Sequence, residues 1–95
     1  MFEHPQLAAL SAVVRFGSFD AAATYLSVTP SAVSQRIKQL EDRIGVILVE
    51  RGQPCRATPT AQKLVNHNDR LLLLERELSI DLGLAWTPLN PSALR

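Results

Sequence analysis

Apolar residues recur at helical spacing near the start of the chain. Leu7, Leu10 and Val14 are three and four residues apart, which places them along one face of an α-helix. Pro5 suits the first turn of that helix, because no backbone N–H is needed there, and Gly17 interrupts the pattern. The sequence therefore predicts a first helix that opens at His4-Pro5 and stops at Gly17.

A short alanine-rich segment follows and has the features of a second helix. Ser18 is a good N-cap, and Asp20 in the first turn suits the positive end of the helix dipole. Residues 19–26 read FDAAATYL, and such small side chains let another helix approach closely. The segment therefore predicts a helix that packs tightly against its neighbours.

A three-residue break at residues 27–29 separates this segment from a longer predicted helix. Thr29 can cap that helix, and Pro30 fits its first position. The helix then runs to about Ile44, where Gly45 provides a left-handed C-terminal stop. Two helices joined by such a tight break match the helix-turn-helix pattern, although the glycine that is frequent in its turn is missing.

Residues 46–58 favour a small β-hairpin. The segment VILVE at residues 46–50 is short, β-branched and apolar, which is typical of a strand. Residues 51–54 have the composition of a turn, and residues 56–58 can return as a second strand. Because a two-stranded hairpin is not stable alone, we expect it to pack on the helices.

A long fourth helix is predicted from about Thr60 to Leu84. Apolar residues recur along it every seven positions, close to a coiled-coil seam over about three heptads. The helix could pack against its own domain, but the seam is longer than so small a domain can cover. We therefore expect it to pair with a second copy of the chain, with Asn68 setting the register at a cost in stability. The expected dimer interface is Leu64, Asn68, Leu71, Leu74, Leu78 and Leu82.

The third predicted helix has one apolar face and an opposite face rich in hydrogen-bonding groups. At about 100° per residue, Val33, Ile37 and Leu40 fall together and predict the core side. The acidic residues come only in the last turn, which suits a helix that enters the DNA major groove by its N-terminus. An ordinary solvated face is the alternative. The outward positions of the first two turns are Ser31, Ser34, Gln35 and Lys38.

The charge balance supports DNA reading only weakly. The formal net charge of the chain is +1, and between residues 29 and 58 five basic residues accompany three acidic ones. Arg51 and Arg56 flank the predicted hairpin turn, where a wing could touch the DNA backbone or a minor groove. A plain surface role for these two arginines is the alternative.

The cysteine and histidine content argues against disulfides and metal sites. Cys55 is the only cysteine, so no disulfide can form within the chain, and a reducing, cytoplasmic location is expected. This thiol is more readily a filler of the hairpin than a redox sensor. His4 and His67 have no further ligands at metal-like spacing, so we expect no metal.

Other functional classes also find little support. The 95 residues make one small domain or a piece of a larger protein. They contain no cluster of nucleophile, base and orienting acid, and no glycine-rich phosphate loop, so we expect neither an enzyme nor a cofactor. No secretory signal opens the chain, and no apolar run approaches the roughly 20 residues of a membrane span.

Three short motifs carry a family resemblance. They are GSF at residues 17–19, SAVSQRIKQLE at residues 31–41 and PCRAT at residues 54–58. With the first two, the chain resembles the N-terminal DNA-binding region of LysR-type transcriptional regulators from about Leu7 to Leu82. The last two together are closer still to the branch that controls basic amino-acid export, the ArgP and LysG type.

The resemblance implies a mainly α fold, a winged helix-turn-helix with a long C-terminal linker helix that pairs antiparallel in a homodimer. It implies residues 1–58 as the DNA-binding domain, 59–85 as the linker and dimerisation helix, and 86–95 as a tail or the start of an interdomain linker. It further implies that a C-terminal effector domain, which would bind lysine or arginine, is absent here. A tetramer is left open for the full-length protein. The implied function is sequence-specific recognition of double-stranded promoter DNA, with a basic amino-acid exporter gene as the target.

The resemblance also assigns site residues. Gln35 stands where most of the wider family has arginine, which changes the expected base preference. Ala61 and Val49 stand where glycine and phenylalanine are common. Arg56 joins the predicted DNA-contacting set from its place beside the hairpin turn. Carried over position by position, the other DNA-contacting residues are Thr29, Pro30, Ser31, Ser34, Gln35, Lys38, Arg51 and Thr58.

Two other functions remain open on the sequence. The chain could be a helical oligomerisation or regulatory module that meets protein, in which residues 31–38 would be plain solvent surface. Salt-dependent binding to duplex DNA separates this function from DNA reading. A small enzyme ranks last, because the sequence holds no cluster of acid, base and nucleophile.

Overall fold

The computed structural model describes residues 4–83. Its elements follow in the order α1, α2, α3, β1, β2 and α4. The long helix ends at Asp81, so its predicted end at about Leu84 was three residues too far along the chain, and the predicted tail at residues 86–95 lies outside the described residues. Among residues 4–83, no helix combines the length and apolarity that crossing a membrane requires.

The first three helices form a cluster in which each contacts the other two. They are α1 (His4–Phe16), α2 (Phe19–Leu26) and α3 (Pro30–Ile44), and their predicted bounds are confirmed. Ser18 caps α2, because its side chain accepts a hydrogen bond from the Ala21 N–H at 3.2 Å. Gly45 ends α3 in the left-handed conformation, with φ at 86°.

The core of this cluster is aliphatic. Leu10, Leu26 and Ile37 are almost fully buried, and each contributes about 1.5–3 kcal/mol by leaving water. Ala22 and Ala23 on α2 are buried as well, and their short side chains allow the close helix packing that the sequence predicts. This core fixes the direction in which α3 presents its other face.

The hairpin is shorter than predicted. Strands β1 (Val49–Glu50) and β2 (Arg56–Ala57) pair antiparallel, Val49 opposite Ala57 and Glu50 opposite Arg56. Residues 46–48 are not part of a strand, so the predicted strand at 46–50 was too long. The reason is a competing acceptor, because the Glu41 carboxylate on α3 takes the N–H of Leu48 at 2.8 Å.

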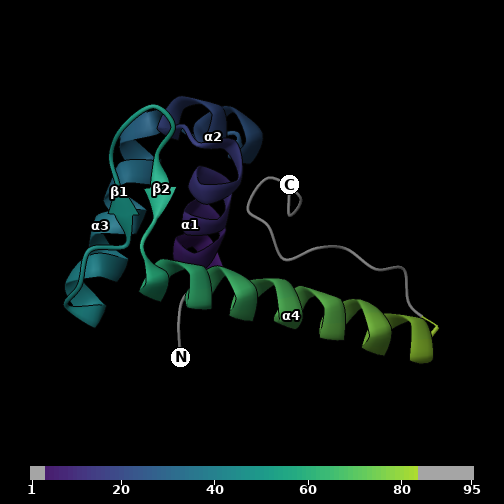
Figure 1. The fold of residues 1–95 in the computed structure, drawn as a ribbon. Coiled ribbons are helices and arrows are strands. Elements are labelled where there is room, and N and C mark those ends of the chain that lie inside the picture. Colours follow the sequence, from purple (N-terminus) through teal and green to yellow (C-terminus); the bar gives the residue numbers. More distant parts are fainter. Residues whose placement is uncertain (1–3, 84–95) are drawn as a thin grey trace.

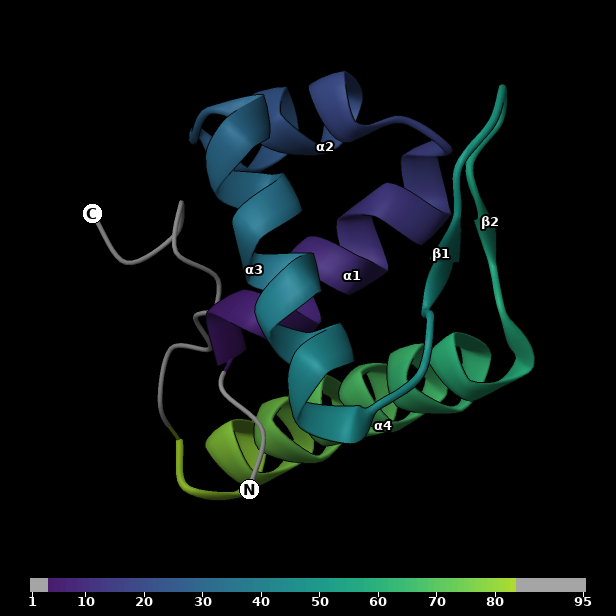
Figure 2. The ribbon, with the colours of Figure 1, turned by 90° about the vertical axis from the view of Figure 1, so that its left-hand side faces the viewer.

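Helix α4 (Pro59–Asp81) starts one residue earlier than predicted, and Thr58 is its N-cap rather than a strand residue. Its first half packs against α1, and its second half projects beyond the other helices (Figure 1). Figure 2 shows α3 in front of α1, with the hairpin beside it and α4 crossing beneath both. The four helices with a two-stranded hairpin make a winged helix-turn-helix with a long last helix.

The predicted leucine seam of α4 divides between these two halves. Leu64 is 9% exposed and Asn68 is 5% exposed, so both are buried within the single chain. Leu71 is half-buried. Leu74, Leu78 and Leu82 are exposed, at 57% for Leu78. Within the single chain, the exposed part of the seam is therefore its second half.

Candidate nucleic-acid interface

The orientation of α3 is the central feature of this site. Val33 and Ile37 are 0% and 1% exposed, which places the apolar face in the core as predicted. Gln35 and Lys38 are exposed, and Ser34 is half-buried at the margin. The outward surface of the first two turns therefore carries amide, ammonium and hydroxyl groups, which are the donors and acceptors that base edges require.

The N-terminus of α3 is an exposed corner. Thr29 is its N-cap, with an extended backbone and a side chain that accepts from the Ala32 N–H at 3.1 Å. Pro30 occupies the first turn, and Ser31 follows it; both are exposed. The positive end of the helix dipole is therefore open to an anion such as a phosphate group.

Arg51 joins the hairpin to this helix. Its guanidinium donates a hydrogen bond to the Ser34 hydroxyl at 3.2 Å. Its Cζ also lies 4.2 Å from the centroid of the Phe19 ring on α2. The structure thus brings together two of the predicted site residues, Arg51 and Ser34, although they are 17 positions apart in sequence.

The other two predicted contact residues near the hairpin have different surroundings. Arg56 is exposed on β2, opposite Glu50 in the neighbouring strand, so an acid shares its surface. The Thr58 hydroxyl donates to the Ile47 carbonyl at 2.9 Å and accepts from the Ala61 N–H at 3.4 Å. Its hydroxyl hydrogen is therefore used within the chain, as a link between the hairpin and α4.

Glu41 is a structural residue that could not be identified from the sequence. Its Oε2 accepts from the Leu48 and Val49 N–H groups, at 2.8 Å and 3.4 Å. This bond attaches the start of β1 to the end of α3 and directs the negative charge toward the hairpin backbone. The sequence showed only an acid in the last turn, because the partner N–H groups belong to every residue alike.

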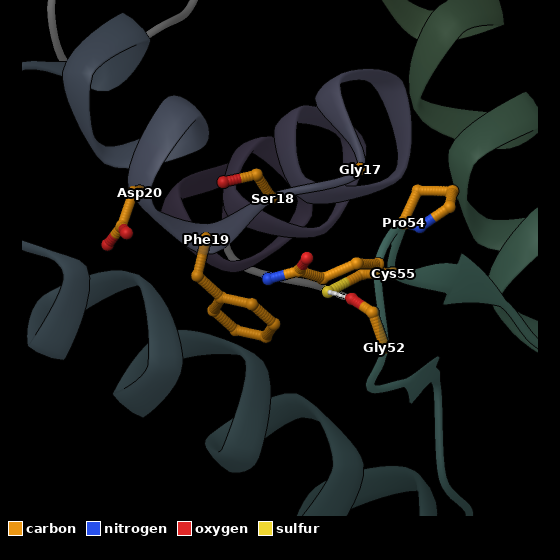
Figure 3. Close-up of a pocket in the computed structure, with 8 residues that line it drawn as sticks. Gly17, Ser18, Phe19, Asp20, Gly52, Pro54 and Cys55 are labelled. Atoms are coloured by element: carbon orange, nitrogen blue, oxygen red, sulfur yellow. Dashed lines mark hydrogen bonds between the residues drawn. The ribbon is translucent and has the colours of Figure 1, made fainter.

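A hollow separates the start of α2 from the hairpin turn (Figure 3). It has a volume of about 410 Å³ and is lined by residues 17–20 and 52–55, with Phe19 and Cys55 on facing sides. The Cys55 thiol donates to the Gly52 carbonyl at 3.5 Å. Within residues 4–83, no three His, Cys, Asp or Glu side chains gather closely enough to hold a metal ion.

Backbone contacts at this hollow attach the hairpin to the helices. The Cys55 N–H donates to the Gly17 carbonyl at 2.9 Å, and Gly17 has φ at +67°. A Cβ at Gly17 would lie 2.7 Å from the Pro54 Cβ, so only glycine fits without a shift. The GSF motif therefore supplies a close approach at Gly17, a helix cap at Ser18 and the ring under Arg51.

Comparison with known proteins shows which family the chain belongs to. Residues 4–62 match the profile of the bacterial regulatory helix-turn-helix proteins of the LysR family. The chain is 57% identical over 79 residues to the HTH-type transcriptional regulator LysG of Mycobacterium tuberculosis, covering 83% of this chain and 26% of that protein. It is 43% identical over 87 residues to the lysine export transcriptional regulatory protein LysG of Corynebacterium glutamicum, covering 90% of this chain and 30% of that protein. The chain thus spans between a quarter and a third of these relatives.

Solved structures give the same grouping. The crystal structure of ArgP from Mycobacterium tuberculosis superposes with a TM-score of 0.83 at 53% identity, covering 87% of this chain and 32% of that one. The BenM DNA-binding domain in complex with benA site 1 DNA superposes with a TM-score of 0.73 at 30% identity, covering 82% and 90%. The second neighbour is itself a protein–DNA complex.

Proposed function

Because the chain belongs to the LysR family of bacterial regulatory helix-turn-helix proteins, we propose that it binds double-stranded promoter DNA as the DNA-binding domain of a transcriptional regulator. The observation that carries the proposal is the exposed face of α3, where Gln35 and Lys38 project from a buried aliphatic base. The similar BenM DNA-binding domain was solved in complex with DNA, which supports duplex DNA as the partner.

In this proposal α3 enters the major groove by its N-terminus. Gln35 and Ser34 read base edges, since a glutamine can make a bidentate pair with adenine. Lys38 and Arg51 neutralise phosphates, and Thr29, Pro30 and Ser31 place the positive end of the helix near the DNA backbone. The Glu41 carboxylate faces the hairpin, so it adds little repulsion at this surface.

A second copy of the chain is the proposed partner of α4. Its exposed second half carries Leu74 and Leu78, and the exposed Leu82 follows as its C-cap; single chains in water rarely leave such a row of leucines uncovered. Lys63 and Arg70 lie on the first half and Glu77 and Asp81 on the second, within about 40° around the helix. An antiparallel pair would bring these opposite charges together beside a leucine seam.

Such a dimer would present two α3 helices to one face of the duplex. Their half-sites would be separated by a whole number of helical turns, and the site would be partly palindromic. The half-buried Leu71 would continue the seam toward the centre of the pair. Leu64 and Asn68 remain predicted interface residues, although each already lies in the single-chain core.

The proposed gene is one for export of a basic amino acid. The support is the name of the Corynebacterium glutamicum relative, a lysine export regulatory protein, and a similar structure of LysG with bound effector Arg. We propose that lysine or arginine binds in the part of such regulators that this chain does not match. The proposed location is the cytoplasm, where the promoter DNA lies, and no chemical conversion is assigned to the chain.

Selection of bound duplexes from a random pool, followed by footprinting, tests the proposal. We expect a shared, partly palindromic sequence, with protection on one face of the DNA and affinity that falls steeply with salt. A module that meets only protein would enrich no sequence and would show no salt-dependent DNA binding. That result would reject DNA reading and leave the dimer question to sedimentation.

A further inference from the structure

Arg51 is held from two sides before any DNA arrives. The centroid of the Phe19 ring lies 4.2 Å from the Arg51 Cζ, and the Ser34 hydroxyl accepts a hydrogen bond from the guanidinium at 3.2 Å. These partners come from α2 and α3, whereas Arg51 follows β1. One exposed side chain of the hairpin therefore contacts both α2 and α3.

Phe19 is able to fix this arginine because the ring is itself fixed. Phe19 is half-buried and packs against the hydrophobic core, and it stands in the first turn of a helix whose N-cap is formed. A guanidinium is flat and weakly hydrated, so it stacks on an aromatic face in a way that an ammonium does not. An exposed arginine without such a support would sample many rotamers and would lose that freedom on binding.

The contact with Ser34 adds a second consequence. A serine hydroxyl has one donor and two acceptor lone pairs, and Arg51 occupies one lone pair. The O–H of Ser34 remains able to donate, which favours acceptor groups on the DNA. The position of Arg51 thus affects which hydrogen-bonding groups of Ser34 are free to meet DNA, and it also affects the phosphate contact.

We propose that Phe19 is a positioning residue for DNA binding, whose ring holds the Arg51 guanidinium between the hairpin and α3 in the geometry that meets a phosphate. The inference rests on the proposed function and adds a residue to it. Phe19 need not touch DNA. It acts through Arg51, and its effect therefore disappears when Arg51 is removed.

A double-mutant cycle on DNA affinity tests this. The variants are Phe19→Leu, Arg51→Ala and the pair, each measured on the selected duplex over a range of salt. We expect Phe19→Leu to weaken binding about two- to fivefold, the range of an exposed cation–π contact. In the Arg51→Ala background the same change should have no further effect, and Phe19→Tyr should retain wild-type affinity.

The chain offers a matched control. Phe16 is 41% exposed and also lies under an arginine, with the Arg15 Cζ 5.4 Å from its ring centroid, but it contacts neither the hairpin arginine nor α3 in the contacts described. Phe16→Leu should leave DNA affinity unchanged. A loss equal to that of Phe19→Leu would show that the effect is general and would overturn the inference.

Further outcomes are decisive even if Phe19→Leu folds poorly. In the unaltered protein, NMR should show the Arg51 side-chain protons shifted upfield by the ring, and ordinary shifts would overturn the stack. An equal loss from Phe19→Leu with and without Arg51 would mean a structural role only. If Arg51→Ala and Gln35→Ala also leave binding unchanged, the proposed function fails; if they weaken it and Phe19→Leu does not, only the inference fails.

Discussion

Helices α3 and α4 are both amphipathic, but they expose different faces to solvent. Helix α3 buries Val33, Ile37 and Leu40 of its aliphatic face and leaves amide, ammonium and hydroxyl groups outside. The second half of α4 leaves leucines outside, because it projects past the helices that could cover it. An exposed polar face suits a hydrated, charged partner such as DNA, whereas an exposed leucine row suits another apolar helix.

The difference shows that a helical repeat of apolar residues can serve either to attach a helix to its own domain or to form an exposed apolar surface. In α3 the apolar stripe specifies how the helix is attached to its own domain. In α4 the stripe changes role along its length, from attachment at Leu64 to an uncovered surface at Leu78. Each assignment can be broken by a substitution on the face that it concerns.

The largest effect is expected for Leu78→Asp. A carboxylate would be buried without a partner in the proposed leucine seam, at a cost of about 3–5 kcal/mol to the dimer. Sedimentation should therefore show a monomer that remains folded. Leu73→Asp is the control, since Leu73 is 55% exposed on a different side of α4, and this variant should stay dimeric. A dimeric Leu78→Asp variant would remove the seam from the interface.

Ile37→Ala should follow, with a loss of about 2–5 kcal/mol in the free energy of unfolding. Ile37 is 1% exposed and attaches α3 to the core, so the substitution leaves a cavity. Lys38→Ala, one residue along, should change the free energy of unfolding by no more than about 0.5 kcal/mol. Denaturant unfolding measures both variants, and equal losses would contradict the orientation of α3.

Gln35→Ala should cost about 1–3 kcal/mol of binding free energy on the selected DNA site and relax the choice at one base pair. The physical reason is the loss of a bidentate contact from an exposed amide. Its stability should be unchanged, in contrast to Ile37→Ala. Titration of duplexes altered one pair at a time measures this, and an equal loss on every duplex would show that Gln35 does not read bases.

Arg51→Ala should have the smallest effect on the choice between DNA sequences. Binding should weaken on every duplex, and the slope of log affinity against log salt should fall by about one unit, because one phosphate contact is lost. Arg56→Ala provides the comparison, since Arg56 lies opposite Glu50 on the hairpin. A slope that Arg51→Ala leaves unaltered would take Arg51 out of the phosphate contacts.

Much of the fold could be predicted because its signals are local. Ser18, Thr29 and Gly45 mark helix ends by their own side chains or by the lack of one, and all three occupy the predicted caps. The hairpin was predicted less well. Its strand length depends on whether the N–H of Leu48 bonds to a strand or to Glu41, and nothing within residues 46–50 decides that.

Local sequence patterns were enough to predict the helices and the outward face of α3, because caps and 3.6-residue periodicity are properties of neighbouring residues. Folding was needed to place Arg51 against Phe19 and to attach the hairpin to Glu41. It was also needed to bury Leu64 in the core while Leu78 stays exposed. Those contacts depend on which elements meet after folding. In the sequence, a stripe of leucines is the same whether or not another helix covers it. A glutamate is likewise the same whichever N–H group donates a hydrogen bond to it.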